Sequence, residues 1–317
     1  MASIWVDYLE RDFLNKEFVE LVNSGLVNGI TSNPAIFANA ITKSDAYKKD
    51  IENLKGKTPE EIYEELAIKD IQKACDVLAD KYDEGDDGFA SIEVNPKLAN
   101  DYKATVDEAL RLVDKIKREN LMIKIPATEA GYKAMADLAK RGININATLI
   151  FSPNQAMRCV EALSNLPRNA EGVISVFVSR FDRELNNQLA TANLSKDRVG
   201  FFNAIKIYNK INEKNLSNVR VLFASTGVKQ DYLEPDYYVE QLNLPNSILT
   251  LPLDVINYIK NKELNESFLF QTKHIDAFFS YLTPANISMQ KTYEKLMTEG
   301  LQAFENSFED MLNSLKG

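Results

Sequence analysis

The sequence predicts an α/β fold, a closed (β/α)8 TIM barrel with additional helices, and three observations support it. Short apolar runs typical of strands alternate with amphipathic helical stretches, a pattern that produces parallel strands joined by crossover helices. Eight such runs occupy about 250 residues, the usual extent of this barrel. Neither GxGxxG nor GxxxxGK[ST] occurs in the 317 residues, so the phosphate loops common on the alternative, an open doubly wound sheet, are missing.

Strands and helices are expected to alternate along the chain. The helices include residues 97–118, 128–140 and 153–164, where apolar side chains recur at helical spacing. The expected strands are residues 3–8, 28–32, 88–94, 121–125, 143–149, 172–178, 220–224 and 247–251.

Capping patterns indicate where several helices begin. Thr58 and Glu61 form a capping box with proline at the first helical position. This box begins an extra helix near residues 59–82, inserted between the second and third strands. Asn33 and Ser152 are each followed by proline directly after a strand, which is typical of an N-cap.

Residues 1–317 are expected to form a single domain. No shift in composition indicates a boundary, and glycine and proline are scarce at 12 and 10, which argues against a long disordered linker. Residues 286–316 are predicted to form a further helix, with apolar positions such as Leu296 and Phe304 at helical spacing. This helix would either close over the barrel or make the contact of a homodimer.

The composition limits the expected partners. A formal net charge of −9 repels polyanions, which argues against nucleic acid as a partner. Asp7 and Glu10 interrupt the apolar stretch that a signal peptide needs, and no run approaches the ~18 apolar residues of a membrane span. We therefore expect a cytoplasmic protein without membrane association, in which Cys75 and Cys159 are buried free thiols.

Polar side chains occupy one face of several expected strands. Side chains alternate between the two faces of a strand, and parallel sheets are covered on both faces, so a solvated face is not expected. These polar groups should therefore converge at the carboxyl ends of the strands, where barrels carry their active sites. The residues that share these faces are Ser3, Trp5 and Asp7; Ser91 and Glu93; Asn144, Asn146 and Thr148; and Ser175, Phe177 and Ser179.

Lys124 is the most informative single residue, because it stands between apolar neighbours in residues 121–126 (LMIKIP). Burial disfavours the charged form of an amine, and a neutral amine attacks a carbonyl carbon to form a Schiff base. Two structural roles compete with this chemistry: an edge lysine that reaches solvent, and a buried ion pair with Asp7 or Glu93. The polar residues expected at the neighbouring strand ends favour the Schiff base.

Other chemistries lack the residues that they need. His274 is the only histidine, so neither a Ser-His-Asp triad nor a histidine-rich metal site is expected. The two cysteines are distant in sequence and do not support a zinc site. We therefore expect no metal ligands.

Four segments together resemble the motifs of the transaldolase family, in the order expected for that family. Tyr132 departs slightly from the aliphatic residue usual after the lysine motif. The match covers most of the chain, and residues 5–7 (WVD) and 224–227 (ASTG) look most like the longer bacterial branch of the family. The four segments are residues 29–37 (GITSNPAIF), 123–128 (IKIPAT), 144–152 (NINATLIFS) and 176–180 (VFVSR).

This resemblance implies a reaction of the non-oxidative pentose phosphate pathway on a barrel without metal or organic cofactor. The donor, fructose 6-phosphate or sedoheptulose 7-phosphate, would condense with Lys124. Cleavage of a carbon–carbon bond would release an aldose phosphate and leave an enamine. The enamine would attack the acceptor aldehyde, erythrose 4-phosphate or glyceraldehyde 3-phosphate, which transfers a dihydroxyacetone unit between sugar phosphates.

The resemblance also implies roles for further residues. Glu93 would act as general acid/base through a water that Thr148 also holds. Asp7 would take the hydroxyl proton during carbon–carbon cleavage. Arg180 would bind phosphate with its planar fork, and its alternative role is a surface ion pair with a carboxylate such as Asp182. The residues that would hold the hydroxyls of the dihydroxyacetone unit or line the substrate site are Thr31, Ser32, Asn33, Asn146, Ser175 and Phe177.

The second phosphate ligand departs from the family pattern. Shorter transaldolases have a second arginine after the seventh strand, whereas this chain has residues 224–229 (ASTGVK) there. Lys229 is the nearest cation, and backbone amides of residues 225–227 could assist it. The alternative is that Lys229 is a solvated loop residue and that Arg180 binds the phosphate alone.

Two other functions compete with transaldolase activity. A Schiff-base fructose 6-phosphate aldolase of the same superfamily would release free dihydroxyacetone. Such aldolases are much shorter, and they tend to carry Gln and Tyr where this chain has Glu93 and Phe177. A non-catalytic sugar-phosphate-binding barrel is expected to lose Lys124 or Glu93, and both are present.

Overall fold

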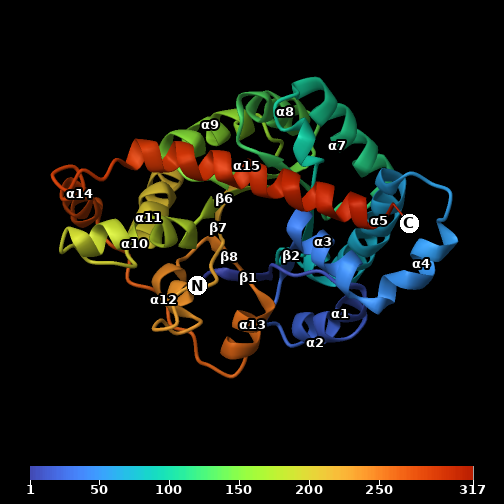
Figure 1. The fold of residues 1–317 in the computed structure, drawn as a ribbon, viewed down its shortest axis with the longest axis horizontal. Helices are drawn as coiled ribbons and strands as arrows, with labels where there is room; N and C mark the ends of the chain where they lie inside the picture. Colours follow the sequence, from blue (N-terminus) through green and yellow to red (C-terminus); the bar gives the residue numbers. More distant parts are fainter. Residues whose placement is uncertain (317) are drawn as a thin grey trace.

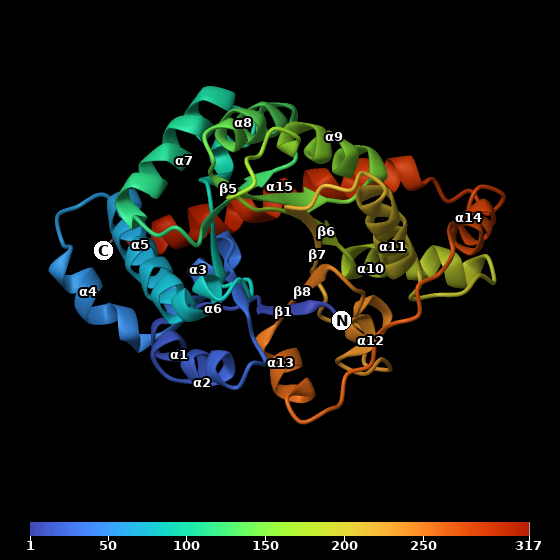
Figure 2. The same cartoon turned by 180° about the vertical axis from the view of Figure 1, so that it is seen from behind.

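The computed structural model describes residues 1–316, and its sheet is a closed barrel of eight parallel strands (Figures 1 and 2). Each strand pairs with the next along the chain, and the last pairs with the first. Every strand overlaps a predicted segment, which confirms the (β/α)8 fold class. The strands are β1 (Ser3–Val6), β2 (Gly29–Thr31), β3 (Phe89–Glu93), β4 (Leu121–Pro126), β5 (Asn144–Ile150), β6 (Gly172–Phe177), β7 (Val219–Ala224) and β8 (Ser247–Leu251).

Helices surround the barrel and supply the connections between its strands (Figure 2). Two short 3-10 helices, η1 (Asp45–Tyr47) and η2 (Pro96–Leu98), lie among them. The α-helices are α1 (Arg11–Asn15), α2 (Glu17–Asn23), α3 (Pro34–Lys43), α4 (Lys48–Asn53), α5 (Pro59–Val77), α6 (Ala79–Asp83), α7 (Tyr102–Ile116), α8 (Glu129–Lys140), α9 (Pro153–Leu163), α10 (Ser179–Thr191), α11 (Val199–Asn212), α12 (Tyr237–Leu242), α13 (Leu253–Ile259), α14 (Thr272–Ser280) and α15 (Met289–Ser314).

The helix boundaries follow the capping chemistry. Thr58 and Glu61 form both bonds of the predicted capping box at the start of α5, and the predicted extra helix continues after a break as α6. The helix predicted from residue 97 begins later, at α7, because Asp101 is the N-cap and its carboxylate accepts a hydrogen bond from the Ala104 amide at 3.0 Å. Ser152 caps α9 together with Gln155.

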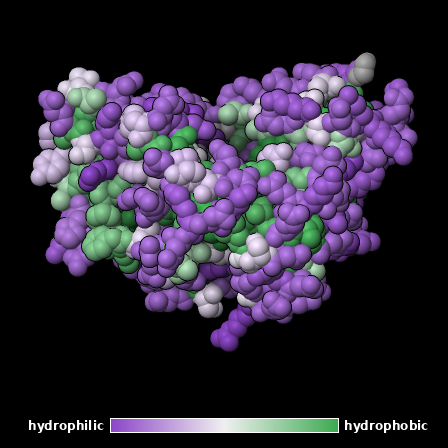
Figure 3. Space-filling model, turned by 90° about the horizontal axis from the view of Figure 1, so that it is seen from below, coloured by the Kyte–Doolittle hydropathy of each residue, from purple (hydrophilic) through white to green (hydrophobic). Residues whose placement is uncertain are grey.

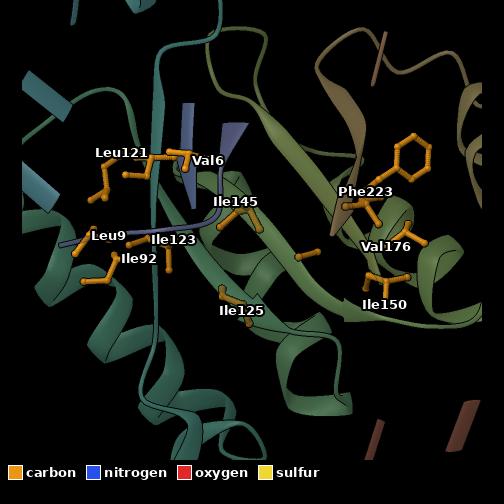
Figure 4. Close-up of a cluster of buried hydrophobic side chains, with 14 of the residues drawn as sticks. Val6, Leu9, Ile92, Leu121, Ile123, Ile125, Ile145, Ile150, Val176 and Phe223 are labelled. Atoms are coloured by element: carbon orange, nitrogen blue, oxygen red, sulfur yellow. The ribbon is translucent and has the colours of Figure 1, made fainter. Parts of the chain in front are cut away.

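The side chains of the strands divide into two apolar layers. Outward-facing residues of the strands, such as Ile92, Ile123 and Val176, pack beneath the helices (Figure 4). Trp5 and Met122 belong to the second layer, which fills the inside of the barrel. This alternation positions Glu93, Lys124 and the other polar residues of the strands on the inner face, as their sequence pattern predicts.

Trp5 occupies the interior of the barrel because the adjacent strand has no side chain there. Trp5 is fully buried and pairs in register with Gly29. A Cβ atom at position 29 would lie only 2.5 Å from the indole ring. Gly29, the only glycine of residues 29–37, is therefore required by packing below the site.

Helix α15 runs across one end of the barrel (Figure 1). It contacts α3, η2 and α10, elements that follow strands β2, β3 and β6, so it covers the end at which the strands terminate. The helix predicted near residues 286–316 thus takes the first of the two positions expected for it.

The surface is mostly polar on the side seen in Figure 3. Both cysteines are free and buried, as predicted. Within residues 1–316, no helix combines the length and the apolar composition needed to cross a bilayer.

Candidate active site

A cavity of about 120 Å³ opens at the carboxyl ends of the strands. Seven of the predicted site residues line it: Asp7, Thr31, Asn33, Lys124, Ser175, Phe177 and Arg180. Ser225, whose backbone amide is a candidate for phosphate binding, also lines it, and four further lining residues were not predicted: Leu222, Ala224, Thr250 and Phe304.

Lys124 is buried at the base of this cavity, with 5% of its surface exposed. Its Nζ atom donates a hydrogen bond to the Ser32 carbonyl at 3.0 Å and lies 3.3 Å from Oε2 of Glu93. Glu93 and Lys124 are neighbours in the β3–β4 register, so the sheet itself sets this pair. The edge lysine that reaches solvent is therefore excluded, and the amine is held between a carbonyl and a carboxyl group.

Glu93 has an unusual environment for a carboxyl group. Burial raises the pKa of Glu93 to about 7, and the nearby charge of Lys124 opposes this rise. Oε2 of Glu93 is engaged in the ion pair with Lys124, whereas Oε1 of Glu93 and the buried hydroxyl of Thr148 have no hydrogen-bond partner among the described residues. Because buried polar groups are nearly always paired, this oxygen and this hydroxyl indicate positions for a water or a substrate hydroxyl.

Asp7 follows β1 and lines the cavity wall. The Thr31 hydroxyl donates to its Oδ1 atom at 2.7 Å and lies 2.6 Å from the hydroxyl of Thr250. Burial raises the pKa of Asp7, whereas the charge of Lys124 and the bond from Thr31 oppose the rise. Thr31 is therefore a neighbour that orients Asp7, and Thr250 is a second member of this network.

The predicted hydroxyl-binding residues are already engaged in part. Asn33 is the N-cap of α3, and its side-chain oxygen accepts from the Ile36 amide at 3.0 Å, which leaves its NH2 group for a substrate. Asn146 lies beneath the cavity, where it donates to the Ser91 hydroxyl at 3.1 Å and accepts from the Ser175 hydroxyl at 2.6 Å. Of this chain of three, only Ser175 reaches the cavity wall.

Ser32 acts through its backbone. Its hydroxyl donates to the Ser91 carbonyl at 2.7 Å, and its side chain is fully buried. Its own carbonyl accepts from Lys124, so the turn after β2 orients the amine.

Arg180 lies in the first turn of α10, with its guanidinium 5.0 Å from the centre of the Phe177 ring. Burial lowers the pKa of Arg180. No ion pair with Arg180 occurs in the described part of the chain, and Asp182 accepts instead from Tyr238 at 2.7 Å and from the Gly200 amide at 3.1 Å. The alternative of an Arg180–Asp182 ion pair is therefore wrong, and the guanidinium is available to an anion.

The turn after β7 carries the candidates for a second anion contact. Ser225 lines the cavity beside Arg180, and its backbone is left-handed with φ of 55°. Lys229 is exposed and is not among the lining residues. Its Nζ atom lies 4.0 Å from the position that a Cβ atom of Gly227 would have, so the side chain stays close to the turn.

Phe304 belongs to α15 and is the lining residue that comes from farthest along the chain. It is 4% exposed, and its ring centre lies 5.8 Å from Nζ of Lys124. The sequence pattern identifies Phe304 as an apolar helix position, but it does not indicate which neighbour that helix face meets.

Comparisons with known proteins identify relatives of the whole chain. A family model described as "Transaldolase/Fructose-6-phosphate aldolase" matches residues 4–315. A protein named transaldolase from Campylobacter jejuni subsp. jejuni serotype O:23/36 (strain 81-176) is 46% identical over 332 residues, which cover 99% of each chain. Another protein of that name, from Helicobacter pylori (strain Shi470), is 42% identical over 314 residues and 98% of each chain.

Proposed function

The chain belongs to the transaldolase family, and from this premise we propose which of its residues carry out the transfer of a dihydroxyacetone unit between sugar phosphates. The observation that carries the proposal is the position of Lys124, which lines the cavity and has its amine 3.3 Å from a carboxyl oxygen of the buried Glu93. Lys124 is the nucleophile in this proposal, and Glu93 moves the protons that imine formation requires.

The first step joins the donor to the enzyme. The Lys124 nitrogen attacks the carbonyl carbon of the ketose phosphate, and the resulting carbinolamine loses water to become an iminium ion. Glu93 accepts a proton from the attacking nitrogen and returns one to the departing hydroxyl, through a water held also by Thr148. The absence of hydrogen-bond partners at Oε1 of Glu93 and at the Thr148 hydroxyl in the described residues supports this relay.

The second step breaks the carbon–carbon bond. Asp7 takes the proton of the hydroxyl next to the breaking bond, the aldose phosphate leaves, and the bonding electrons move into the iminium group to form an enamine. Asn33 and Ser175 hold the hydroxyls of the unit that remains, and Asn146 positions Ser175. The acceptor aldehyde then reacts by the reverse sequence, in which Asp7 returns the proton.

A borohydride experiment tests the proposal. Reduction in the presence of fructose 6-phosphate should fix a three-carbon adduct, and peptide mapping should find it on Lys124 alone. An adduct on a different lysine would show that the assignment of the nucleophile is wrong.

The phosphate site gives a prediction that separates Arg180 from Lys229. In our proposal Arg180 binds the phosphate bidentately and Lys229 adds a point charge beside the Ser225 turn. Arg180→Ala and Lys229→Ala should each raise the KM for phosphorylated donors about 10-fold or more, if each removes a charge-assisted bond of ~1.5–3 kcal/mol. Arg180→Lys should not restore the wild-type KM, because an ammonium group lacks the planar fork.

Free dihydroxyacetone as donor is the control for both variants, since a phosphate ligand should not affect its use. If Lys229→Ala leaves the KM of phosphorylated donors unchanged, or weakens both kinds of donor equally, Lys229 is not a phosphate ligand. Because Lys229 is exposed, the Lys229→Ala variant tests the proposed phosphate site more stringently than the Arg180→Ala variant does.

Three further expectations stay predictions: a single domain over residues 1–317, a homodimer, and a cytoplasmic location. Sedimentation equilibrium of the full chain tests the homodimer by measuring the mass of the particle in solution.

A further inference from the structure

Helix α15 brings two positions, one helical turn apart, against the two cations of the site. A Cβ atom at Gly300 would lie 3.1 Å from Nη1 of Arg180 and 3.0 Å from Cδ2 of Leu149. Phe304, four residues later on the same face, has its ring centre 5.8 Å from Nζ of Lys124. Phe304 thus forms part of the cavity wall, and Gly300 packs against Arg180, which also lines the cavity.

We propose that Phe304 shields the enamine carbon of the unit bound to Lys124 from protonation by water, and so favours transfer of this unit over its release. This inference rests on the proposed function, in which Lys124 carries the unit. Phe304 is a shielding residue and takes no part in proton transfer.

The enamine has two fates, which diverge at its carbon atom. In transfer, the enamine carbon forms a bond to the aldehyde carbon of the acceptor, and the aldehyde oxygen takes up a proton. In release, the enamine carbon takes up a proton from water. In both cases water then adds to the resulting imine carbon, and the carbon–nitrogen bond breaks to give the product, a ketose phosphate or dihydroxyacetone, and the free amine. The ratio of release to transfer therefore measures the access of water, as proton donor, to the enamine carbon.

The surroundings of Lys124 make Phe304 the apolar cover of the amine. Ser32 and Glu93 provide the polar contacts of the nitrogen. The Phe304 ring has no hydrogen-bonding atom, and it belongs to the same apolar cluster as Phe177. Exclusion of water from such a surface suppresses unwanted protonation of a reactive intermediate such as the enamine.

The cover is held in place by contacts along α15. The Tyr293 hydroxyl donates to Asn203 of α11 at 2.9 Å, and Lys97 forms an ion pair with Glu309 at 3.0 Å. These contacts lie before and after Phe304 in the helix, so they hold this part of α15 over the site.

The test compares Phe304→Ala with Phe308→Ala in the full-length enzyme. Phe308 is on the same helix and is also buried, at 2% exposure against 4% for Phe304, but it packs on Tyr63 at 5.2 Å between ring centres and does not line the cavity. Dihydroxyacetone release from fructose 6-phosphate without acceptor is measured against transfer to erythrose 4-phosphate. The ratio of release to transfer should rise about 10-fold or more in Phe304→Ala, equivalent to ~1.4 kcal/mol between the two barriers, and should stay at the wild-type value in Phe308→Ala.

A rise in both variants, or in neither, overturns the shielding role. If Phe304→Ala does not fold, the same comparison between Phe304→Leu and Phe308→Leu decides, because leucine keeps apolar contacts but leaves part of the ring volume to water. Borohydride trapping on the wild type separates this inference from the proposed function. An adduct on Lys124 with an unchanged ratio rejects the shield alone, whereas no adduct on Lys124 rejects the function on which it rests.

Discussion

Replacement of Lys124 by methionine should abolish transfer, with a fall in kcat/KM on the order of 10⁶-fold, the scale seen when a covalent nucleophile is removed. Methionine has a similar length and an apolar side chain, but it cannot form an imine. Borohydride should then fix no adduct on the protein. Steady-state transfer from fructose 6-phosphate and mass mapping of the reduced protein measure both effects.

Lys124→Arg is the matched control for charge. Arginine keeps a cation beside Glu93, yet it does not form a Schiff base with the donor, so this variant should be as inactive as Lys124→Met. Substantial transfer by Lys124→Arg would mean that the positive charge, and not the nucleophile, is what the reaction requires.

The stability of Lys124→Met should depend on pH through Glu93. Burial already raises the pKa of Glu93 to about 7, and loss of the lysine charge should raise it further. A carboxyl group whose pKa is higher in the folded than in the unfolded state favours folding at low pH, and this contribution is lost as pH rises through the folded pKa. The difference in unfolding free energy between wild type and variant should therefore grow from about pH 6 to about pH 8, which urea titrations measure.

Replacement of Glu93 by glutamine should lower turnover by about 10²–10⁴-fold, the usual contribution of a general acid/base group. Glutamine keeps the shape of the side chain but cannot carry the proton, so donor binding should change little. Single-turnover kinetics with fructose 6-phosphate separate the two effects. Turnover close to the wild-type value would mean that Glu93 serves only as the ion-pair partner of Lys124.

The pH profile gives a second measure of the same role. Because the pKa of Glu93 is about 7, the carboxylate that accepts the proton of the attacking amine is lost as pH falls through that value. The kcat/KM for the donor should therefore rise with pH through about 7 in the wild type, and Glu93→Gln should lack this limb. Glu108→Gln is the matched control, since Glu108 is a largely buried glutamate outside the cavity whose pKa burial also raises. This variant should keep the wild-type profile.

Much of this site follows from the two-residue period of the strands. The alternation around Glu93 and Lys124 predicts that both point inside the barrel, and pairing of β3 with β4 makes them neighbours. Asn33 shows the limit of such reasoning, because a residue suited to bind substrate also caps α3, and only the folded turn reveals that its oxygen is engaged.

Other features depend on contacts between distant segments and could not be read from local patterns. Thr250 is a polar residue in the mostly apolar strand β8, and its role in the site follows only from its contact with Thr31. The helical period of residues 286–316 predicts an apolar face, but the neighbour that this face meets is a property of the complete barrel. For the same reason, Lys229 could be proposed from its charge but not located relative to the cavity.

The position of α15 has a consequence for the order in which the chain is made. All eight strands precede this helix in the sequence, so Asp7, Glu93 and Lys124 leave the ribosome before Phe304 does. A nascent barrel that has closed its sheet but not yet received α15 would hold the lysine and its proton-transfer partners in a mouth open to water. Such a chain should consume sugar phosphates as a hydrolytic aldolase, and the last helix to be synthesised converts it into an enzyme that conserves the three-carbon unit.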